Sequence, residues 1–293
     1  MSSPAPADVN RVPKRERADL LLLRRGLASS RERAQSHILA GEVWSEGQRV
    51  DKPGKPLPVE APLELRLRRP AFASRAGAKL CGALERLGLE VQGVRALDVG
   101  ASTGGFTDCL LQRGAATVVA LDVGRGQLDA RLRNDPRVEP REGVNARYLQ
   151  AGDFPLPFEL ITVDVSFISL TKILPALLPL LASGGRLLVL VKPQFELARG
   201  QVGRGGVVKQ PARRLQALRS VVSVADRLGL QVQAALPSPL PGRDGNLEAF
   251  LLLARDRGLT GARLQQALAD AAVVAQPADQ AQQTRAAAQR TKE

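Results

Sequence analysis

A glycine-rich turn between two short apolar runs most constrains what this chain can fold into. The first run, residues 95–99, contains Asp98 and leads into Gly100-Ala-Ser-Thr-Gly-Gly105. The second run, residues 117–122, ends in Asp122. Glycines let the backbone turn sharply and approach a ligand where a Cβ would collide. A strand, a glycine turn, a helix and a second strand that ends in an acid form half of a nucleotide-type βαβ crevice.

The order of these glycines favours S-adenosylmethionine over a dinucleotide as the ligand. The dinucleotide fingerprint is G-x-G-x-x-G, and this turn has a different order. A pyrophosphate also favours a bare helix N-terminus, whereas S-adenosylmethionine carries no phosphate and needs only a looser turn. Asp122 can accept hydrogen bonds from both ribose hydroxyls of such a ligand. An ordinary glycine-rich turn of an α/β domain is the alternative.

The charge of the chain indicates a polyanionic partner. The 293 residues carry a formal net charge of +13, and the sequence pI is near 10.8. Such an excess favours RNA or DNA, and the alternative is a basic protein from an arginine-rich proteome. Aromatic residues make up only 3% of the chain, which argues against base stacking on several aromatic side chains as the main binding mode.

The sequence offers little for a metal site or a histidine-based active site. Its two cysteines, Cys81 and Cys109, have no metal-ligand spacing, and His37 is the single histidine. We therefore expect no metal. The N-terminal residues lack the basic and apolar regions of a signal peptide, and no apolar run reaches the roughly 18 residues of a membrane span. We expect a cytoplasmic protein with no membrane partner, and its oligomeric state stays open, with a monomer favoured.

The N-terminal part of the chain is expected to hold a small separate module behind a tail. Residues 1–16 are rich in proline and charge and are predicted to be a disordered tail. Residues 18–26 and 29–41 are predicted helices, each ended by a glycine. Residues 43–50 predict a hairpin around Glu46-Gly47, and residues 52–58 predict a loop because they contain three prolines.

Residues 17–70 resemble the S4 RNA-binding domain. The resemblance rests on a leucine-rich first helix, on the pattern G-x-x-x-S-R-x-x-A over residues 26–34 and on G-x-V-x-x-E-G over residues 41–47. Basic residues on its two short helices suit contacts to phosphates, which give affinity without sequence specificity. A solvated charged face is the alternative. The expected RNA contacts are Arg17, Arg24, Arg25, Arg31 and Arg33.

From residue 95 onward, predicted strands alternate with helices, which indicates a mainly parallel, doubly wound sheet. The expected strands are residues 95–99, 117–122, 160–164, 186–192, 231–236 and 249–254. A further strand near Val138 has too weak a pattern to be assigned. Apolar residues between 170 and 181 recur at helical spacing and are expected in the core, and residues 213–228 repeat the helical pattern. The Ala/Gln-rich residues 258–293 are predicted to be a partly disordered tail.

Four polar residues lie where a reacting group could be activated. Asp164 and Lys192 end consecutive predicted strands, so we expect them at the same rim as the glycine turn. Lys79 lies on a helix before the sheet, and Glu248 begins the last strand. Taken singly, Lys79 and Glu248 are more often ordinary surface charges. The set as a whole on this fold favours a functional role.

The group that would accept the methyl group of S-adenosylmethionine can be narrowed by comparing the chain with the motifs of other methyl-transfer reactions. Methylation of base amino groups usually needs the motif (D/N)-P-P-(F/Y), which the stretch Asp164-Val-Ser-Phe167 lacks. Methylation of cytosine at C5 needs a cysteine nucleophile near the site, and neither cysteine lies at the end of a late strand. A ribose 2′-hydroxyl fits better, and it must lose its proton as the methyl group transfers. A lysine near other cations and low-dielectric walls can accept that proton, and carboxylates then orient the lysines.

Residues 17–254 as a whole resemble the TlyA family, S4-domain ribosomal RNA 2′-O-methyltransferases that are also called hemolysin A and are related to the RrmJ/FtsJ fold. The resemblance implies an α/β fold, with a Rossmann-like class I methyltransferase sheet over residues 71–257 and a small α+β S4 RNA-binding domain before it. The motifs that carry it are Ser74-Arg-Ala-Gly-Ala-Lys-Leu80, Asp98-Val-Gly-Ala-Ser-Thr-Gly-Gly-Phe-Thr107, Asp164-Val-Ser-Phe-Ile-Ser169, Leu190-Val-Lys-Pro-Gln-Phe-Glu196 and Gly245-Asn-Leu-Glu-Ala-Phe250.

The resemblance also implies roles for residues at matching positions. Ser74 and Arg75 would lie near the RNA or the cofactor, and residues 143–147 would border the adenosine. The catalytic tetrad would be Lys79, Asp164, Lys192 and Glu248. The contacts of S-adenosylmethionine would be Asp98, Gly100, Ser102, Thr103, Gly104, Gly105, Phe106, Asp122, Val123, Asn145 and Asp164.

The function implied by the resemblance is transfer of a methyl group from S-adenosylmethionine to cytidine 2′-hydroxyls of ribosomal RNA, on one or both ribosomal subunits. Two other functions stay open. The chain could be a ribosome-assembly RNA-binding protein with a non-catalytic cofactor site, although the intact turn and tetrad count against it. It could be a membrane-active toxin, although no signal peptide or spanning segment supports that.

Overall fold

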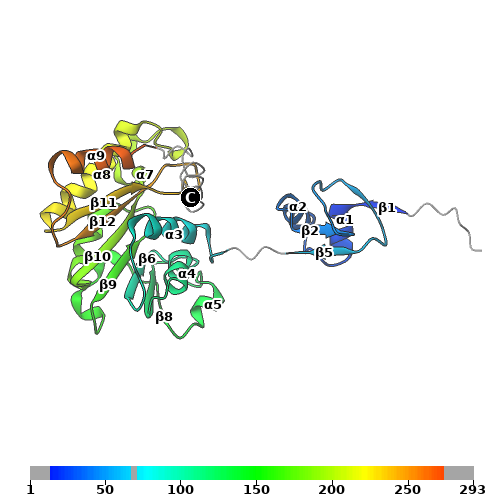
Figure 1. Ribbon diagram of the computed structural model, residues 1–293, viewed down its shortest axis with the longest axis horizontal. Coiled ribbons are helices and arrows are strands. Elements are labelled where there is room, and N and C mark those ends of the chain that lie inside the picture. The colour runs from blue at the N-terminus through cyan, green and yellow to red at the C-terminus, as the bar shows by residue number, and fades with distance from the viewer. Residues whose placement is uncertain (1–13, 67–70, 274–293) are drawn as a thin grey trace, which may run out of the picture. The chain divides into compact units, whose positions relative to one another are not determined.

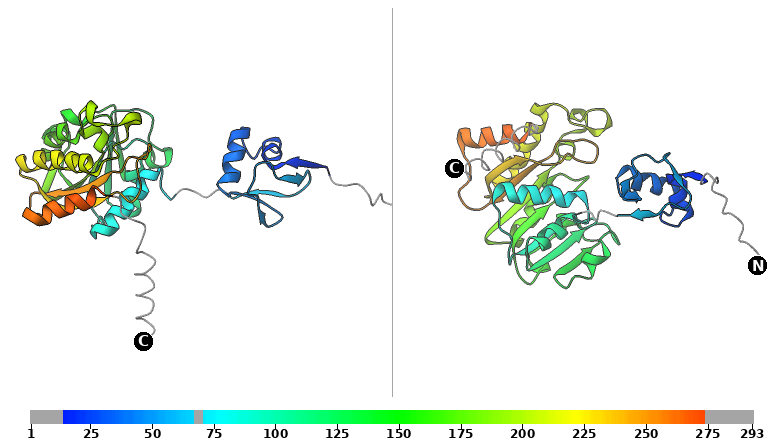
Figure 2. Two further views of the ribbon diagram at one scale, coloured as in Figure 1. Left: turned by 90° about the horizontal axis from the view of Figure 1, so that it is seen from above. Right: turned by 45° about the vertical axis from the view of Figure 1, so that its right-hand side comes forward.

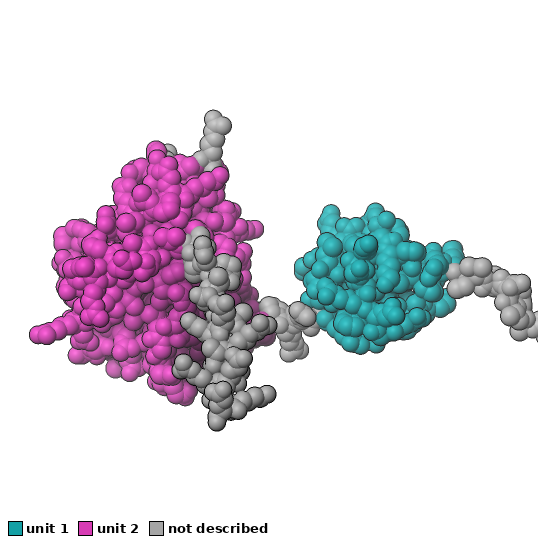
Figure 3. Space-filling model, turned by 45° about the horizontal axis from the view of Figure 1, so that its top comes forward, with its two compact units in different colours: residues 1–70 teal, residues 71–293 magenta. Residues whose placement is uncertain are grey.

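The computed structural model describes residues 14–66 and 71–273. The chain divides into two compact units, residues 1–70 and 71–293 (Figure 3). The described residues include no helix that is long and apolar enough to cross a membrane. Within the same residues, no group of three or more His, Cys, Asp or Glu side chains is placed to hold a metal ion.

The first unit is a small α+β fold around one apolar core. Its strands are β1 (Arg15–Arg17), β2 (Val43–Ser45), β3 (Gln48–Arg49), β4 (Pro56–Pro58) and β5 (Leu63–Leu65), and its helices are α1 (Ala18–Arg24) and α2 (Arg31–Leu39). Leu21, Ile38 and Val43 meet in the core, fully buried. The hydroxyl of Ser30 caps α2, because it accepts a hydrogen bond from the backbone N–H of Arg33 at 3.2 Å.

Both predicted helices and the predicted hairpin of this unit are confirmed, and the structure differs from two other expectations. Residues 56–58 were expected to be loop, but they pair antiparallel with β1. The end strand tolerates two prolines, and Leu57 between them is buried in the core. β1 begins at Arg15, inside the stretch expected to be a disordered tail, and residues 1–13 of that stretch lie outside the described residues.

The second unit is built on a seven-stranded sheet in the order β11-β12-β10-β9-β6-β7-β8. Its strands are β6 (Arg95–Val99), β7 (Thr117–Asp122), β8 (Val138–Glu142), β9 (Phe158–Val163), β10 (Leu181–Val191), β11 (Gln231–Pro237) and β12 (Ala249–Ala254). The five neighbouring strands β10, β9, β6, β7 and β8 run parallel to one another, whereas β12 runs antiparallel to both of its neighbours. The predicted α/β class with a mainly parallel sheet is therefore confirmed.

Helices cover both faces of this sheet and give an α/β/α layering (Figure 1). α3 (Arg75–Leu87), α4 (Gly105–Gln112) and α5 (Ala130–Arg133) pack on one face, and the right-hand view in Figure 2 shows α3 running across it. α6 (Leu174–Leu177), α8 (Pro211–Arg227) and α9 (Gly261–Ala271) pack on the other. The short helix α7 (Pro193–Glu196) follows β10 directly.

Three segments of the second unit differ from the sequence-based expectation. β8 was too weakly patterned to assign because it is an edge strand in which only Val138 is buried. The apolar stripe between residues 170 and 181 is in the core as expected, but Pro175 and Pro179 divide it into short helical turns. α9 lies within the predicted tail and buries Leu268. The sequence did not predict this helix because its many alanines hide the helical period. The rest of the predicted tail, residues 274–293, lies outside the described residues.

Asp98, near the end of β6, is completely buried. Its Oδ2 accepts a hydrogen bond from Thr107 Oγ1 at 2.7 Å, and its Oδ1 accepts one from Thr162 Oγ1 at 3.1 Å. The first bond closes the chain from β6 to α4 around the glycine turn, and the second ties β6 to β9. Burial raises the pKa of Asp98 to about 7, because it outweighs the hydrogen bonds that favour the carboxylate.

Asp98 should make the folded protein less stable as the pH rises from about 4 to about 7. Over this range the unfolded chain loses the Asp98 proton while the folded chain keeps it, so ionisation favours the unfolded state. The pKa of Asp98 rises from its ordinary value of 3.8 to about 7, and this shift corresponds to a loss of unfolding free energy on the order of 4 kcal/mol. Urea unfolding at about pH 4.5 and about pH 8 should show a smaller loss in Asp98→Asn than in the unchanged protein. Equal losses would contradict this assignment.

Candidate active site

The glycine turn after β6 is possible only without side chains at its key positions. Gly100 has a φ of +87°, and a Cβ there would lie 2.6 Å from the backbone oxygen of Asp164, just after β9. A Cβ on Gly105 would lie 2.2 Å from Oγ of Ser74, the residue that caps α3. The turn therefore brings the ends of β6 and β9 and the start of α3 into direct contact.

Asp122, at the end of β7, is held in a fixed orientation beside this turn. Its Oδ2 accepts a hydrogen bond from the backbone N–H of Ser102 at 2.8 Å, and its Oδ1 accepts one from that of Gly124 at 2.7 Å. It lines a cavity of about 460 Å³, which we call the Asp122 cavity. Val123, which follows it, is 70% exposed at the same cavity.

Most of the residues predicted to contact the cofactor line this cavity or the one beside it. The Asp122 cavity has Gly100, Ser102, Asp122, Val123, Asn145 and Asp164 in its lining. Thr103, Gly105 and Phe106 line the neighbouring cavity. Asp98 and Gly104 line neither cavity. Asp98 is buried, and Gly104 faces Leu132 of α5, where a Cβ would collide. These two residues support the turn on the side away from the cavities.

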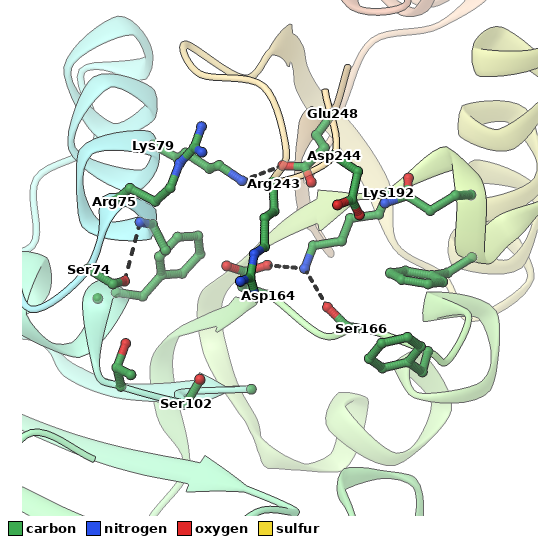
Figure 4. Close-up of a pocket in the computed structure, with 18 of the residues that line it drawn as sticks. Ser74, Arg75, Lys79, Ser102, Asp164, Ser166, Lys192, Arg243, Asp244 and Glu248 are labelled. Carbon is green, nitrogen blue, oxygen red and sulfur yellow. Dashed lines mark hydrogen bonds and ion pairs between the residues drawn. The ribbon is translucent and has the colours of Figure 1, made fainter. Parts of the chain in front are cut away.

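The neighbouring cavity, of about 1070 Å³, contains two ion pairs (Figure 4). Nζ of Lys79, on α3, lies 2.6 Å from Oε2 of Glu248, just before β12. Nζ of Lys192, just after β10, lies 2.7 Å from Oδ1 of Asp164. We call this the lysine cavity, and it shares Gly100 and Asp164 with the Asp122 cavity. The structure thus brings together all four residues of the expected tetrad from four separate elements.

These charged side chains are largely removed from water. The side chains of Lys79 and Glu248 are 8% and 3% exposed, and those of Lys192 and Asp164 are 11% and 14% exposed. Nζ of Lys192 donates a hydrogen bond to Oγ of Ser166 at 3.0 Å. Oδ1 of Asp164 is near the ammonium but receives no well-directed hydrogen bond, so attraction of charge holds this pair. Buried charges of this kind are stable only beside an opposite charge.

The two ion pairs act on each other. Burial raises the pKa of Glu248, and the nearby positive charge of Lys79 opposes the rise most strongly. The charge of Lys192 opposes it as well, and that of Asp164 adds to it. Gly242, in the turn before β12, packs directly against the carboxylate of Glu248, because a Cβ on Gly242 would lie only 2.5 Å from Oε1. The four charges form one compact cluster with no net charge when all are ionised.

Sequence reasoning missed two aromatic side chains at the entrance of the lysine cavity. Phe167 is 92% exposed and has a φ of +66°, which is uncommon for a residue with a side chain. Its ring centroid lies 5.3 Å from that of Phe195 on α7. Both line the lysine cavity, and Phe167 lines the Asp122 cavity too. The available signal was a phenylalanine soon after a strand end, in a chain with few aromatic residues.

Two of the arginines expected to contact RNA are bound to an acid inside the first unit. Nη2 of Arg17 lies 3.0 Å and Nε of Arg31 lies 3.1 Å from Oδ2 of Asp19, whose side chain is fully buried. Hydrogen bonds from Arg17, reinforced by Arg31 and Gln35, hold the pKa of Asp19 well below its usual range. Part of the basic charge on α1 and α2 therefore stabilises the unit itself.

The other three arginines of this set differ in their contacts. Arg24 pairs with Glu16 at 3.1 Å, and Arg25 donates a hydrogen bond to the backbone oxygen of Ala61 at 2.8 Å. Arg33 is exposed and has no ion pair within the described part of the first unit. Arg33 is therefore the arginine of this set most available to a partner.

Ser74 and Arg75 lie at the start of α3, and both line the lysine cavity. The Ser74 hydroxyl accepts a hydrogen bond from the backbone N–H of Ala76 at 3.3 Å. Arg75 donates one to the backbone oxygen of Pro241, in the connection between β11 and β12, at 2.8 Å. Arg243, on the same connection, lines both cavities and was not predicted from the sequence.

Removing one partner of the Lys79–Glu248 pair should destabilise the second unit. Glu248→Leu leaves the ammonium of Lys79 buried without a partner, and we expect the free energy of unfolding to fall by about 3 kcal/mol. The double variant Lys79→Met with Glu248→Leu should regain most of this loss, because no uncompensated charge remains. Urea unfolding followed by circular dichroism would measure both. A double variant whose loss equals the sum of the two single losses would show that the residues are not coupled.

The chain matches known proteins along most of its length. Residues 72–255 match the FtsJ-like methyltransferase family, and residues 16–62 match the S4 domain. The 16S/23S rRNA (cytidine-2′-O)-methyltransferase TlyA of Mycobacterium tuberculosis is 45% identical over 88% of this chain and 97% of its own, and hemolysin A of Brachyspira hyodysenteriae is 40% identical over 76% and 93%. A solved structure from Streptococcus thermophilus, described as a candidate hemolysin, covers 96% of this chain and 99% of its own with a TM-score of 0.68 at 37% identity. The chain therefore belongs to the FtsJ-like methyltransferase family and, with its S4 domain, to the TlyA proteins that its motifs resemble.

Proposed function

We propose that the protein transfers a methyl group from S-adenosylmethionine to the 2′-hydroxyl of cytidine in ribosomal RNA. The observation that carries the proposal is the buried cluster of two lysines and two carboxylates where two cavities adjoin. Family membership supports methyl transfer, and the cluster supports a hydroxyl as the acceptor. The name of the M. tuberculosis relative supports cytidine in ribosomal RNA.

The Asp122 cavity suits S-adenosylmethionine in size and in its polar groups. Its volume of about 460 Å³ falls within the roughly 300–1,000 Å³ usual for small-molecule sites. Two backbone N–H groups already orient the Asp122 carboxylate, and each of its oxygens keeps a free lone pair for a ribose hydroxyl. Gly100 lines the cavity, and its lack of a side chain lets the end of β6 lie directly against Asp164. The cofactor, when bound, supplies an electrophilic methyl group on a sulfonium centre.

The lysine cluster would remove the proton from the acceptor hydroxyl. A ribose hydroxyl is a weak nucleophile that must lose its proton as its oxygen bonds to the methyl carbon and the carbon–sulfur bond breaks. Nζ of Lys192 would take this proton after releasing its own to solvent, and its partners Asp164 and Ser166, which line both cavities, would hold it beside the acceptor. Asp164 would stabilise the ammonium that forms. Lys79 and Glu248 would help to hold the hydroxyl in line with the methyl group.

Phe167 would support the base of the acceptor nucleotide. RNA-modifying sites take up single-stranded bases by stacking them on aromatic side chains, and this contact tolerates any base. The ring of Phe167 is almost fully exposed and borders both cavities. A base stacked on it would leave the attached ribose close to the lysine cluster.

The first unit would supply affinity for RNA. The side chains of Arg17, Arg24 and Arg31 are about half exposed in spite of their internal partners, so they keep outward N–H donors. Arg33 adds a charge that has no ion pair with any residue described in this unit. Contacts from such residues to phosphates would hold the substrate regardless of its sequence, while the second unit would select the reacting ribose.

Lys192→Ala should lower the rate of methyl transfer at least about 100-fold, because the hydroxyl loses its proton acceptor. The protein would be incubated with tritiated S-adenosylmethionine and unmodified 30S or 50S subunits, and the RNA would then be digested with alkali. Alkali cannot cleave beside a 2′-O-methyl group, so label should appear in a resistant dinucleotide. Lys172→Ala, an exposed lysine that lines neither cavity, is the matched control and should behave as the unchanged protein.

Two results would count against this proposal, the first against the enzyme activity and the second against the role of Lys192. Binding of S-adenosylmethionine and RNA with no label on either subunit would favour the RNA-binding assembly protein instead. Full activity in Lys192→Ala would leave methyl transfer in place but remove the lysine from the mechanism. Measuring cofactor binding by calorimetry in the same variants separates a lost proton acceptor from a lost cofactor.

Arg33→Ala should weaken RNA binding about fivefold and lower the slope of log K against log salt by about 1, with thermal unfolding unchanged. Arg31→Ala should change both binding and unfolding, because Arg31 also holds the buried Asp19. Fluorescence anisotropy with labelled RNA at several salt concentrations measures the first property. An Arg33→Ala variant with unchanged affinity and salt slope would place the RNA on another surface.

A further inference from the structure

The connection between β11 and β12, residues 238–248, forms a fixed rim over the lysine cavity; we call it the rim turn. Its two ends are joined by a hydrogen bond from the backbone N–H of Ser238 to the backbone oxygen of Glu248 at 2.9 Å. A second bond, from the N–H of Gly242 to the oxygen of Asn246 at 2.8 Å, closes the tip. The turn therefore has a defined shape of its own.

Side chains also fasten the rim turn to its neighbours. Asn246 is 1% exposed, and its amide accepts a hydrogen bond from the N–H of Val208 at 2.9 Å and donates one to the oxygen of Gly206 at 2.8 Å. From α3, Arg75 donates to the oxygen of Pro241 at 2.8 Å. A residue at the tip of the turn is thus presented from a preorganised support, so little ordering is needed when it binds.

Arg243 is the residue that this support presents. It is exposed, lines both cavities and points into the lysine cavity in Figure 4. Lys79 and Lys192 are paired with carboxylates, and Arg75 is bonded to the rim turn. Among the described residues that line the lysine cavity, Arg243 is the basic side chain without an ion pair or side-chain hydrogen bond. Its guanidinium is therefore the charge left available to a ligand.

We propose that Arg243 binds a phosphate of the RNA strand beside the acceptor nucleotide and so positions the ribose at the lysine cluster. This inference rests on the proposed function. Every ribose in RNA lies between two phosphodiesters, so a ribose at the cluster brings a phosphate to the rim of the cavity. A guanidinium matches phosphate oxygens with two parallel N–H donors. Asp244, the acid beside Arg243, lines the same cavity and would repel a phosphate, so the guanidinium must outweigh this repulsion.

The position of Arg243 favours a phosphate over the carboxylate of the cofactor. The Asp122 cavity is where the cofactor would be anchored, through Asp122 at the end of β7. Arg243 also lines that cavity, but it is exposed and lies on the turn between the two strands at the other end of the sheet. An RNA strand that approaches the lysine cavity from solvent on this side would meet Arg243.

The test compares Arg243→Ala and Arg243→Lys with Arg257→Ala. Arg257 is also an exposed arginine without an ion pair among the described residues, and it follows the far end of β12, at the edge of the sheet opposite the site. With unmodified ribosomal subunits, Arg243→Ala should raise KM for RNA about tenfold and lower the salt slope of RNA binding by about 1. Arg243→Lys should lie between, because it keeps the charge but loses the two-donor geometry. Arg257→Ala should match the unchanged protein.

Two outcomes overturn the inference while leaving the proposed function intact. The first is an unchanged KM and salt slope in Arg243→Ala when the unchanged protein is active. The second is weaker binding of S-adenosylmethionine with an unchanged KM for RNA, which assigns Arg243 to the cofactor carboxylate. If the unchanged protein transfers no methyl group, the proposed function fails, and the salt slope of RNA binding still decides whether Arg243 contacts a phosphate.

Discussion

The burial of two ammonium groups is the constraint on which the site depends. An ammonium left unpaired in this environment costs several kcal/mol, so each lysine needs a carboxylate within contact distance. Lys79 comes from α3 and Lys192 follows β10, and their partners Glu248 and Asp164 adjoin β12 and β9. The fold must bring four elements to one point before the cluster can be stable.

The antiparallel direction of β12 is what completes the cluster. Asp164 and Lys192 follow parallel strands, and their side chains reach the site edge because the carboxyl ends of such strands share an edge. Glu248 precedes its strand, and would lie at the opposite edge if β12 were parallel. Because β12 is inverted, Ala249 at its start is paired with Val191 at the end of β10. The antiparallel direction of β12 therefore places Glu248, at the start of the strand, at the same edge as Asp164 and Lys192.

The sequence was informative wherever local pattern and local chemistry agreed. The glycine turn, the strands from β6 to β12 other than β8, and the acids and lysine at strand ends follow from apolar runs that stop at polar residues. The edge strand β8 and the helix α9 escaped because packing, and not periodicity, holds them in place. Arg243 was also missed, since nothing in a turn sequence indicates which cavity it will face.

Charge in the sequence was harder to interpret than hydrophobicity, because the partners of a charge are set by tertiary structure. Asp98 belongs to a motif that suggested a cofactor ligand, yet its hydrogen bonds to Thr107 and Thr162 make it a support for the turn. Arg17 and Arg31 looked like free basic residues on a helical surface, yet both bind one buried acid, Asp19. A count of basic residues therefore overstates the charge that a partner can meet.

A neutral cluster at the reaction site has a consequence for how the protein would hold a polyanion. If the two lysines were not matched by two carboxylates, RNA phosphates would bind to them directly and block the approach of a hydroxyl. Because the carboxylates cancel them, affinity for RNA must come from charges elsewhere, in a chain whose formal net charge is +13. Arg33 on the first unit and Arg243 on the rim turn lie outside the cluster and are free of ion pairs within the described residues. Separation of binding charge from reacting charge lets the phosphates be held firmly while the ribose hydroxyl meets a lysine that is not already occupied by a phosphate.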